Sequence, residues 1–276
     1  NNLNKPAERE GLDLSPEAMA VMEMLLAREP EHRYQSADDA LLDLCVSEGL
    51  PLPEENALIR ESFLQRAEFV GRECELARFK AALAAAQAGQ GSGLLVGGES
   101  GVGKTRLLDE MRTLALVQGV MVLSGQVTAL SSKPYELWRT VTRRLLLDVD
   151  VSDGEAGIIK EIVPDIDRLL KRPVAKPPQL QDQAHKERLT ATLRSLFLKA
   201  GKPIALFLED LQWATDSLIP LKHLLQFIGE MPLLIVANYR YEERPELPAE
   251  LPQMQPMLLN RLGTEEITAL TVSMLG

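Results

Sequence analysis

The stretch Leu94-Leu95-Val96-Gly97-Gly98-Glu99-Ser100-Gly101-Val102-Gly103-Lys104-Thr105 decides the fold of this 276-residue chain. Its first residues form a short apolar run, which is typical of a strand that is buried on both faces. Residues 105–118 follow with many good helix formers. Between the two, the pattern GxxxxGK[ST] is matched at every fixed position. We therefore predict a strand, a glycine-rich turn and a helix, which is the repeating unit of an α/β fold.

The glycine-rich turn has the chemistry of a phosphate-binding loop, or P-loop. Glycines let several backbone N–H groups converge on one anion, and the helix that opens at Lys104 adds the positive end of its dipole. Lys104 is expected to reach the β- and γ-phosphates of a nucleotide, and the Thr105 hydroxyl is expected to bind Mg²⁺. The predicted nucleotide-binding residues of this segment are Gly98, Ser100, Gly101, Val102, Gly103, Lys104, Thr105 and Arg106.

Strands and helices alternate on both sides of the loop. We predict strands at 94–97, 120–127, 203–208 and 232–239, with a last strand at 257–262, and helices at 73–88, 105–118, 135–147, 185–200 and 217–228. Residues 172–183 and 242–253 are predicted to be loops. This alternation predicts a P-loop NTPase fold: a three-layer αβα sandwich with a mostly parallel five-stranded sheet.

Two carboxylates, Glu209 and Asp210, end the apolar run 204–208. In parallel α/β sheets, ligands bind at the carboxyl ends of the strands. Glu209 is expected to hold Mg²⁺, directly or through water, and Asp210, or the pair jointly, to polarise the attacking water. Taken alone, two acids at this place are equally typical of a solvated turn.

The predicted strand 233–239 ends in Asn238, Tyr239 and Arg240. Arg240 would lie at the same edge of the sheet and could sense the γ-phosphate, so we count it with Lys104, Glu209 and Asp210 as catalytic. Two alternatives stay open: Arg240 could instead pair with Glu242 or Glu243, and Asn238 could be the polar sensor.

Composition limits the other classes of function. The formal net charge of −10 argues against nonspecific nucleic-acid binding, which needs a basic surface. The two cysteines, Cys45 and Cys74, have no metal-ligand spacing. Residues 1–10 show no basic region followed by an apolar stretch, so we expect no signal peptide there, and the apolar runs are too short to span a bilayer. We expect no membrane or nucleic-acid partner and a cytoplasmic location.

Four motifs together resemble the ATPase domain of signal-transduction ATPases with numerous domains (the STAND class), which are related to AAA+ proteins. They are the segment 69–73, the P-loop, the segment 206–214 and the segment 235–240, in that order. The resemblance implies ATP or ADP with Mg²⁺ as cofactors. It also implies that Val70, Gly71 and Arg72 lie at the adenine and that Arg240 is the nucleotide sensor. One residue is missing around Asp216 relative to the family pattern, so the role of Asp216 stays open.

A second resemblance lies at the start of the chain. Residues 25–37 are similar to the last helices of a protein-kinase C-lobe, and Arg33 matches the arginine that pairs with an activation-segment glutamate there. The HRD, DFG and nucleotide-lysine motifs of kinases are absent from this chain, so this segment is not expected to phosphorylate a substrate. The alternative is an unrelated helical hairpin. The order of the two parts is similar to bacterial serine/threonine kinases that carry an ATPase regulator.

We therefore expect residues 1–48 to be a helical segment, 49–65 a linker, 66–262 the ATPase domain and 263–276 the start of a truncated helical lid. The expected function is a slowly hydrolysing ATP switch within a larger signalling protein. The resemblance implies that this larger protein is a serine/threonine kinase. Expected partners are other domains of the same protein and signalling proteins, with an oligomer in the activated state. The alternative is an ADP-locked scaffold without turnover. A small-molecule kinase and a remodelling AAA+ ring are less favoured, since no arginine-rich lid or second sensor can be placed.

Overall fold

The computed structural model describes residues 15–27, 33–34, 37–50, 71–129, 134–175, 182–264 and 266–268. The chain divides into two compact units, residues 1–54 and 55–276. Within the described residues, no helix has both the length and the apolar character needed to cross a membrane.

The first unit contains two helices, α1 (Pro16–Leu25) and α2 (Ala37–Glu48), which pack against each other. The start of α1 is set locally, because the Ser15 hydroxyl accepts a hydrogen bond from the Ala18 N–H at 3.0 Å and Pro16 opens the helix. Tyr34 donates a hydrogen bond to Asp43 of α2 at 2.9 Å, and Arg33 donates to the Ala27 carbonyl at 2.6 Å. These bonds fasten the connection between the helices.

The second unit is built on a five-stranded sheet. Its strands are β1 (Ser92–Gly98), β2 (Met121–Gln126), β3 (Ile204–Glu209), β4 (Leu233–Tyr239) and β5 (Met254–Leu259). Their order is β2-β3-β4-β1-β5, and every neighbouring pair is parallel. The predicted α/β class and five-stranded sheet are confirmed. The prediction of 257–262 for the last strand is wrong by three residues, because Met254 at its start already pairs with Gly93.

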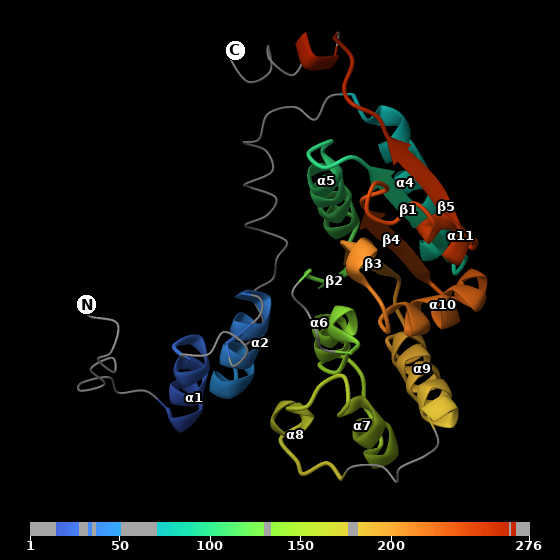
Figure 1. The fold of residues 1–276 in the computed structure, drawn as a ribbon. Helices are drawn as coiled ribbons and strands as arrows, with labels where there is room; N and C mark the ends of the chain where they lie inside the picture. Colours follow the sequence, from blue (N-terminus) through green and yellow to red (C-terminus); the bar gives the residue numbers. More distant parts are fainter. Residues whose placement is uncertain are drawn as a thin grey trace, which may run out of the picture. The chain divides into compact units, whose positions relative to one another are not determined.

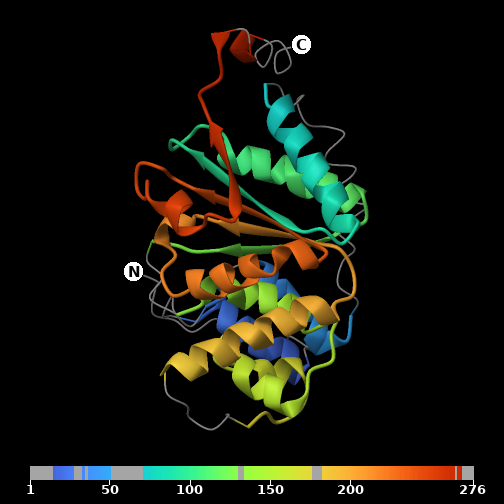
Figure 2. The same ribbon diagram turned by 90° about the vertical axis from the view of Figure 1, so that its right-hand side faces the viewer.

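Helices cover both faces of this sheet (Figures 1 and 2). One face carries α4 (Glu73–Gln87) and α5 (Lys104–Val117). The other carries α6 (Glu136–Leu145), α9 (Asp182–Lys199) and α10 (Leu218–Gln226). Shorter helices are α7 (Asp153–Ile159), α8 (Ile166–Leu169), α11 (Leu247–Glu250) and the 3-10 turns η2 (Leu211–Trp213) and η3 (Ile228–Glu230). The segment 242–253 is therefore not wholly a loop, since it contains α11.

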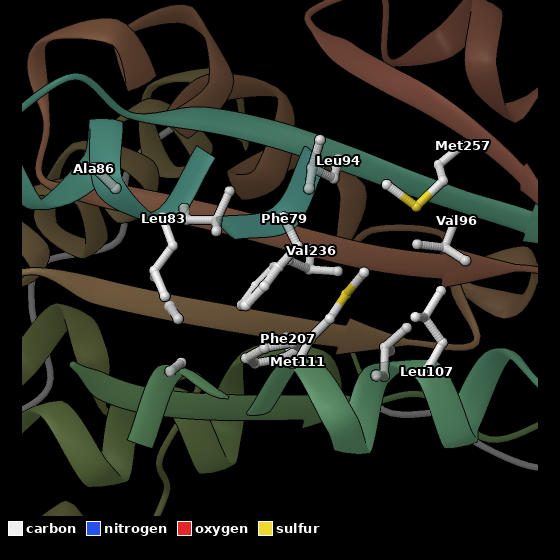
Figure 3. Close-up of a cluster of buried hydrophobic side chains, with 14 of the residues drawn as sticks. Phe79, Leu83, Ala86, Leu94, Val96, Leu107, Met111, Phe207, Val236 and Met257 are labelled. Carbon is white, nitrogen blue, oxygen red and sulfur yellow. The ribbon is translucent and has the colours of Figure 1, made fainter. Parts of the chain in front are cut away.

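The core between the sheet and α4/α5 follows the two-residue period of the strands. Alternate residues of β1 and β4, such as Leu94, Val96 and Val236, point toward Phe79 and Leu107 of the covering helices (Figure 3). Each of these five side chains is at most 1% exposed. Because β1, β3 and β4 are apolar on both faces, they form the buried centre of the sheet, as the unbroken apolar runs predict.

The strand order places β1 between β4 and β5, although β2 is the next strand in the chain. The connection after β1 therefore runs in the opposite direction from the connection after β4. Such a reversal opens a crevice at the carboxyl ends of parallel strands, where ligands bind in α/β folds. The P-loop lies at this point.

Candidate nucleotide-binding site

The P-loop connects β1 to α5. Gly101 and Gly103 have φ angles of +78° and +97°, which side chains with a Cβ rarely adopt. At Gly98 the constraint is space, because a Cβ there would lie 2.7 Å from a methyl group of Val102. The sequence needs glycine at these positions to bend the chain directly into the helix at Lys104.

Lys104 lies at the centre of the loop and is buried. Its ammonium group donates hydrogen bonds to the carbonyl oxygens of Gly98 and Glu99, at 2.8 and 2.7 Å. Burial lowers the pKa of Lys104, and the positive charge of Arg240 lowers it further, while Asp210 acts in the opposite direction. The predicted catalytic residues Lys104, Arg240 and Asp210 are therefore close enough for their charges to interact.

Asp210 follows β3 in the left-handed conformation, with φ of +59°. Three amide side chains hold it there. Gln126 at the end of β2 and Gln212 of η2 each donate a hydrogen bond to its carboxylate at 3.0 Å. Asn238 of β4 accepts a hydrogen bond from the Asp210 backbone N–H at 2.8 Å. Among the described contacts, this carboxylate is bound by neutral amide groups and has no ion pair with a cation. Its negative charge is therefore not compensated locally, and it acts on Lys104 of the P-loop.

Glu209 has a different environment, although it is the neighbouring residue. Arg112 of α5 donates to one of its carboxylate oxygens at 2.5 Å, and the Asn238 amide donates to the other at 3.5 Å. The guanidinium of Arg112 also lies 5.0 Å from the centre of the Phe207 ring. The two predicted acids are thus unequal, because an arginine compensates the charge of Glu209.

Arg240 follows β4, as predicted. Its guanidinium pairs with Glu243 at 2.8 Å and lies 5.3 Å from the centre of the Trp213 ring. This pairing is one of the alternatives that the sequence left open. The Arg240 backbone N–H donates to the side-chain oxygen of Gln212 at 3.1 Å.

The remaining predicted residues surround the loop. Thr105, Ser100 and Gly101 are exposed at its mouth, and Arg106 is half-buried in the first turn of α5. Arg72 is buried and donates hydrogen bonds to the carbonyls of Val102, at 3.4 Å, and Asn260, at 2.5 Å. Gly71 precedes it with a φ of +80°. Val70 lies outside the described residues.

Sequence reasoning missed several residues at this edge. Glu99 of the P-loop accepts hydrogen bonds from Tyr241, at 3.0 Å, and Arg261, at 2.8 Å. Gln126, Gln212 and Arg112 were also not singled out. A signal existed for two of them: Gln126 ends a strand as Glu209 does, and Arg112 lies two turns after Lys104 on the same helix.

The site fits Mg²⁺ better than a metal held by protein alone. Among the described residues there is no group of three or more His, Cys, Asp or Glu that could hold a metal ion. Mg²⁺ is usually held by one or two protein oxygens together with phosphate oxygens. The exposed Thr105 hydroxyl and the carboxylates at the end of β3 are donors of this hard-oxygen type.

Comparison with known proteins gives one match that identifies a family, the AAA ATPase domain, over residues 68–236. No curated protein matches the chain. Among solved structures, the chain is similar to the Aeropyrum pernix ORC1 protein in complex with DNA, with 20% identity, a TM-score of 0.43 and coverage of 76% of this chain and 50% of that one. It is also similar to Drosophila ORC bound to DNA, with 13% identity, a TM-score of 0.45 and coverage of 94% and 57%.

These structural likenesses are too weak to support an argument about DNA, and the chain spans about half the length of the solved chains that it matches. The family match is of another kind, because it covers more than half of the chain, from the segment before α4 to β4. It includes the P-loop and the acidic end of β3. The chain belongs to the AAA ATPase domain family.

Proposed function

We propose that this chain is an ATP-binding regulatory switch that hydrolyses ATP slowly with Mg²⁺. The observation that carries the proposal is the meeting of Lys104, Asp210 and Arg240 at one edge of the sheet, where their charges act on the Lys104 ammonium. Lys104 would leave the carbonyls of Gly98 and Glu99 to bind the β- and γ-phosphates. Arg240 would leave Glu243 to reach the γ-phosphate.

Asp210 is the proposed general base, because its carboxylate is held by neutral amides and no arginine compensates it. Thr105 and Glu209 are proposed to hold Mg²⁺, with Glu209 acting through water, since Arg112 and Asn238 already bind its two oxygens. The ion would neutralise charge that develops on the phosphates. Gly71, Arg72 and Val70 are proposed to lie at the adenine, beside the P-loop that Arg72 contacts.

A switch needs different affinities for its partners in the ATP and ADP states. Arg240 is suited to distinguish these states, because a side chain that binds the γ-phosphate must give up its contacts with Glu243 and Trp213. We further propose that the chain is the STAND-type regulator of a multidomain signalling protein, with residues 1–48 derived from a kinase C-lobe. An HRD loop and a DFG motif encoded upstream would support the kinase parent, and an upstream region without them would overturn it.

The second candidate is a scaffold that holds ADP without turnover. The ion pairs Arg112–Glu209 and Arg240–Glu243 favour it, because both neutralise groups that hydrolysis would use. The nucleotide released when the purified protein is denatured, together with phosphate release under excess ATP, separates the two candidates. Bound ADP with no phosphate release would favour the scaffold.

Calorimetric titration with ATP and ADP tests the binding site. Lys104→Ala should abolish binding of both nucleotides, whereas Lys80→Ala, which removes an exposed lysine of α4, should leave it unchanged. Asp210→Asn should retain binding and stop phosphate release. Unchanged ATP affinity in Lys104→Ala would sink the site assignment.

A further inference from the structure

The side-chain amide of Gln212 joins the ends of β3 and β4. Its nitrogen donates a hydrogen bond to the Asp210 carboxylate at 3.0 Å, and its oxygen accepts one from the Arg240 backbone N–H at 3.1 Å. Gln212 is 8% exposed, so water competes little for these bonds. One buried residue therefore contacts both the proposed base and the proposed sensor.

The orientation of this amide follows from its partners. A backbone N–H can only donate, so the oxygen of Gln212 must face Arg240 and the NH₂ group must face Asp210. A carboxylate at this position could accept from Arg240 but would place an oxygen against the Asp210 oxygen. The site thus requires an amide rather than an acid of the same shape.

Gln126 provides a natural comparison. It also donates one hydrogen bond of 3.0 Å to the Asp210 carboxylate, but from the end of β2. In the described part of the chain it has no bond to β4 or to Arg240. Gln126 therefore shares one of the two contacts of Gln212, and the contact with Arg240 distinguishes the two glutamines.

We propose that Gln212 is a positioning residue that couples the acid at the end of β3 to the nucleotide sensor after β4. It fixes the backbone from which the Arg240 side chain extends, and it holds the Asp210 carboxylate in place. If Arg240 shifts toward a γ-phosphate, the Gln212 side chain that is bound to its backbone N–H shifts with it. The amide group that donates to Asp210 then moves as well. The inference rests on the proposed function, because it assigns Gln212 to the same reaction.

Three variants test the coupling through the ratio of ATP to ADP affinity and the rate of phosphate release. Gln212→Leu removes both contacts and should slow phosphate release about tenfold or more and lower the affinity ratio at least about fivefold. Gln212→Glu keeps the acceptor for Arg240 and should keep the affinity ratio. Its new carboxylate oxygen cannot donate the hydrogen bond to Asp210 and repels the Asp210 oxygen, so phosphate release should slow about tenfold or more. Gln126→Leu should slow phosphate release but keep the affinity ratio.

Several outcomes would overturn the coupling. Gln126→Leu is the control and should have the same ratio of ATP to ADP affinity as the unchanged chain. If Gln212→Leu has this ratio too, Gln212 does not position Arg240. If Gln212→Glu releases phosphate at the unchanged rate, the amide of Gln212 does not hold Asp210 for the reaction. Retained ADP binding shows that a variant is folded. If Gln212→Leu fails to fold, Gln212→Glu decides, because it should slow phosphate release and keep the affinity ratio.

The failure of the proposed function would look different. A chain that binds nucleotide but releases no phosphate loses the proposed hydrolysis, while the affinity ratio in Gln212→Leu still tests the positioning of Arg240. A chain that binds ATP and ADP equally tightly would overturn both the switch and the coupling.

Discussion

The guanidinium of Arg112 lies 2.5 Å from a carboxylate oxygen of Glu209, although 97 residues separate them in the chain. This ion pair fastens α5, the helix that the P-loop opens, to the end of β3. Both side chains are mostly buried, at 17% and 16% exposed. The same guanidinium pairs with Asp109 at 2.8 Å, so the position of Arg112 is fixed from two sides.

Removal of Arg112 should therefore destabilise the domain. Arg112→Leu leaves Glu209 without its cation in a mostly buried place, and we expect the free energy of unfolding to fall by about 2–3 kcal/mol. Urea denaturation measures this loss. The double variant Arg112→Leu with Glu209→Leu should recover part of it, because the mostly buried carboxylate is then gone and only the more exposed Asp109 has lost its partner. A double variant that is less stable than both single variants would contradict the interpretation.

Glu99 should titrate at unusually low pH. The hydrogen bond from Arg261, followed by that from Tyr241, lowers the pKa of Glu99 below its ordinary value near 4.5. Arg261→Ala should return the pKa toward that value, and Tyr241→Phe should do so by a smaller amount. Carbon-13 NMR of the labelled carboxyl groups measures both shifts. An equal or larger effect of Tyr241→Phe would reverse the assigned order of causes.

Glu155 provides a prediction for acid stability. Despite a desolvation penalty from burial, its contacts with Lys199 and Ser152 lower the pKa of Glu155 to about 2. Since the folded value lies below the unfolded one, near 4.5, the ionised group stabilises the fold above pH 4.5. This contribution is lost as the pH falls toward 2.

Glu155→Gln should then lower the free energy of unfolding by about 0.5–1 kcal/mol near pH 7 through loss of the partly exposed ion pair with Lys199, while a glutamine can still complete the capping box with Ser152. The difference between the variant and the unchanged chain should shrink between pH 4.5 and pH 2. Denaturation curves at three pH values measure it. A difference that stays constant down to pH 2 would show that the pKa of Glu155 is not lowered.

Phe79 should be one of the most costly positions to truncate. Its ring is fully buried and lies 6.3 Å from the ring of Phe207, between α4 and β3. Phe79→Ala should cost about 3–5 kcal/mol of stability because it leaves a cavity in the core. Val117→Ala, on α5 and 48% exposed, is the control and should change stability by roughly 0.5 kcal/mol or less. Thermal and urea denaturation compare the two.

A comparison of Gly103 with Gly154 tests the cost of a left-handed backbone without any steric clash of the added methyl group. A Cβ added at Gly103 or at Gly154 would meet no atom within 4 Å, but only Gly103 has a positive φ, of +97°. Gly103→Ala should therefore cost about 1–2 kcal/mol or distort the P-loop, and weaken nucleotide binding. Gly154→Ala, in α7, should be neutral or stabilise by up to about 1 kcal/mol. Equal nucleotide affinity in both variants would show that the left-handed turn is not needed for binding.

The sequence by itself determined the fold class and the place of the phosphate loop. Short apolar runs bounded by turn residues favour strands that are buried on both faces. The pattern GxxxxGK[ST] fixes where the chain turns, because Gly101 and Gly103 have φ angles that few other residues adopt. The start of α1 at Ser15 also depends only on neighbouring residues, because the Ser15 hydroxyl accepts a hydrogen bond from the N–H of Ala18. The last strand was misplaced because β5 lies at the edge of the sheet, where Gln255 and Leu258 are exposed and the apolar pattern is broken.

Only the tertiary structure decided which polar groups meet at the nucleotide site. Arg261 reaches Glu99 across 162 residues because β5 lies beside β1, and Gln212 reaches Arg240 because β4 lies beside β3. The strand order that creates these neighbours results from packing the whole sheet, and no local pattern contains it. The sequence therefore identified the residues that can carry the chemistry. Their pairing, and the difference between Glu209 and Asp210, arise from side chains that the fold brings together.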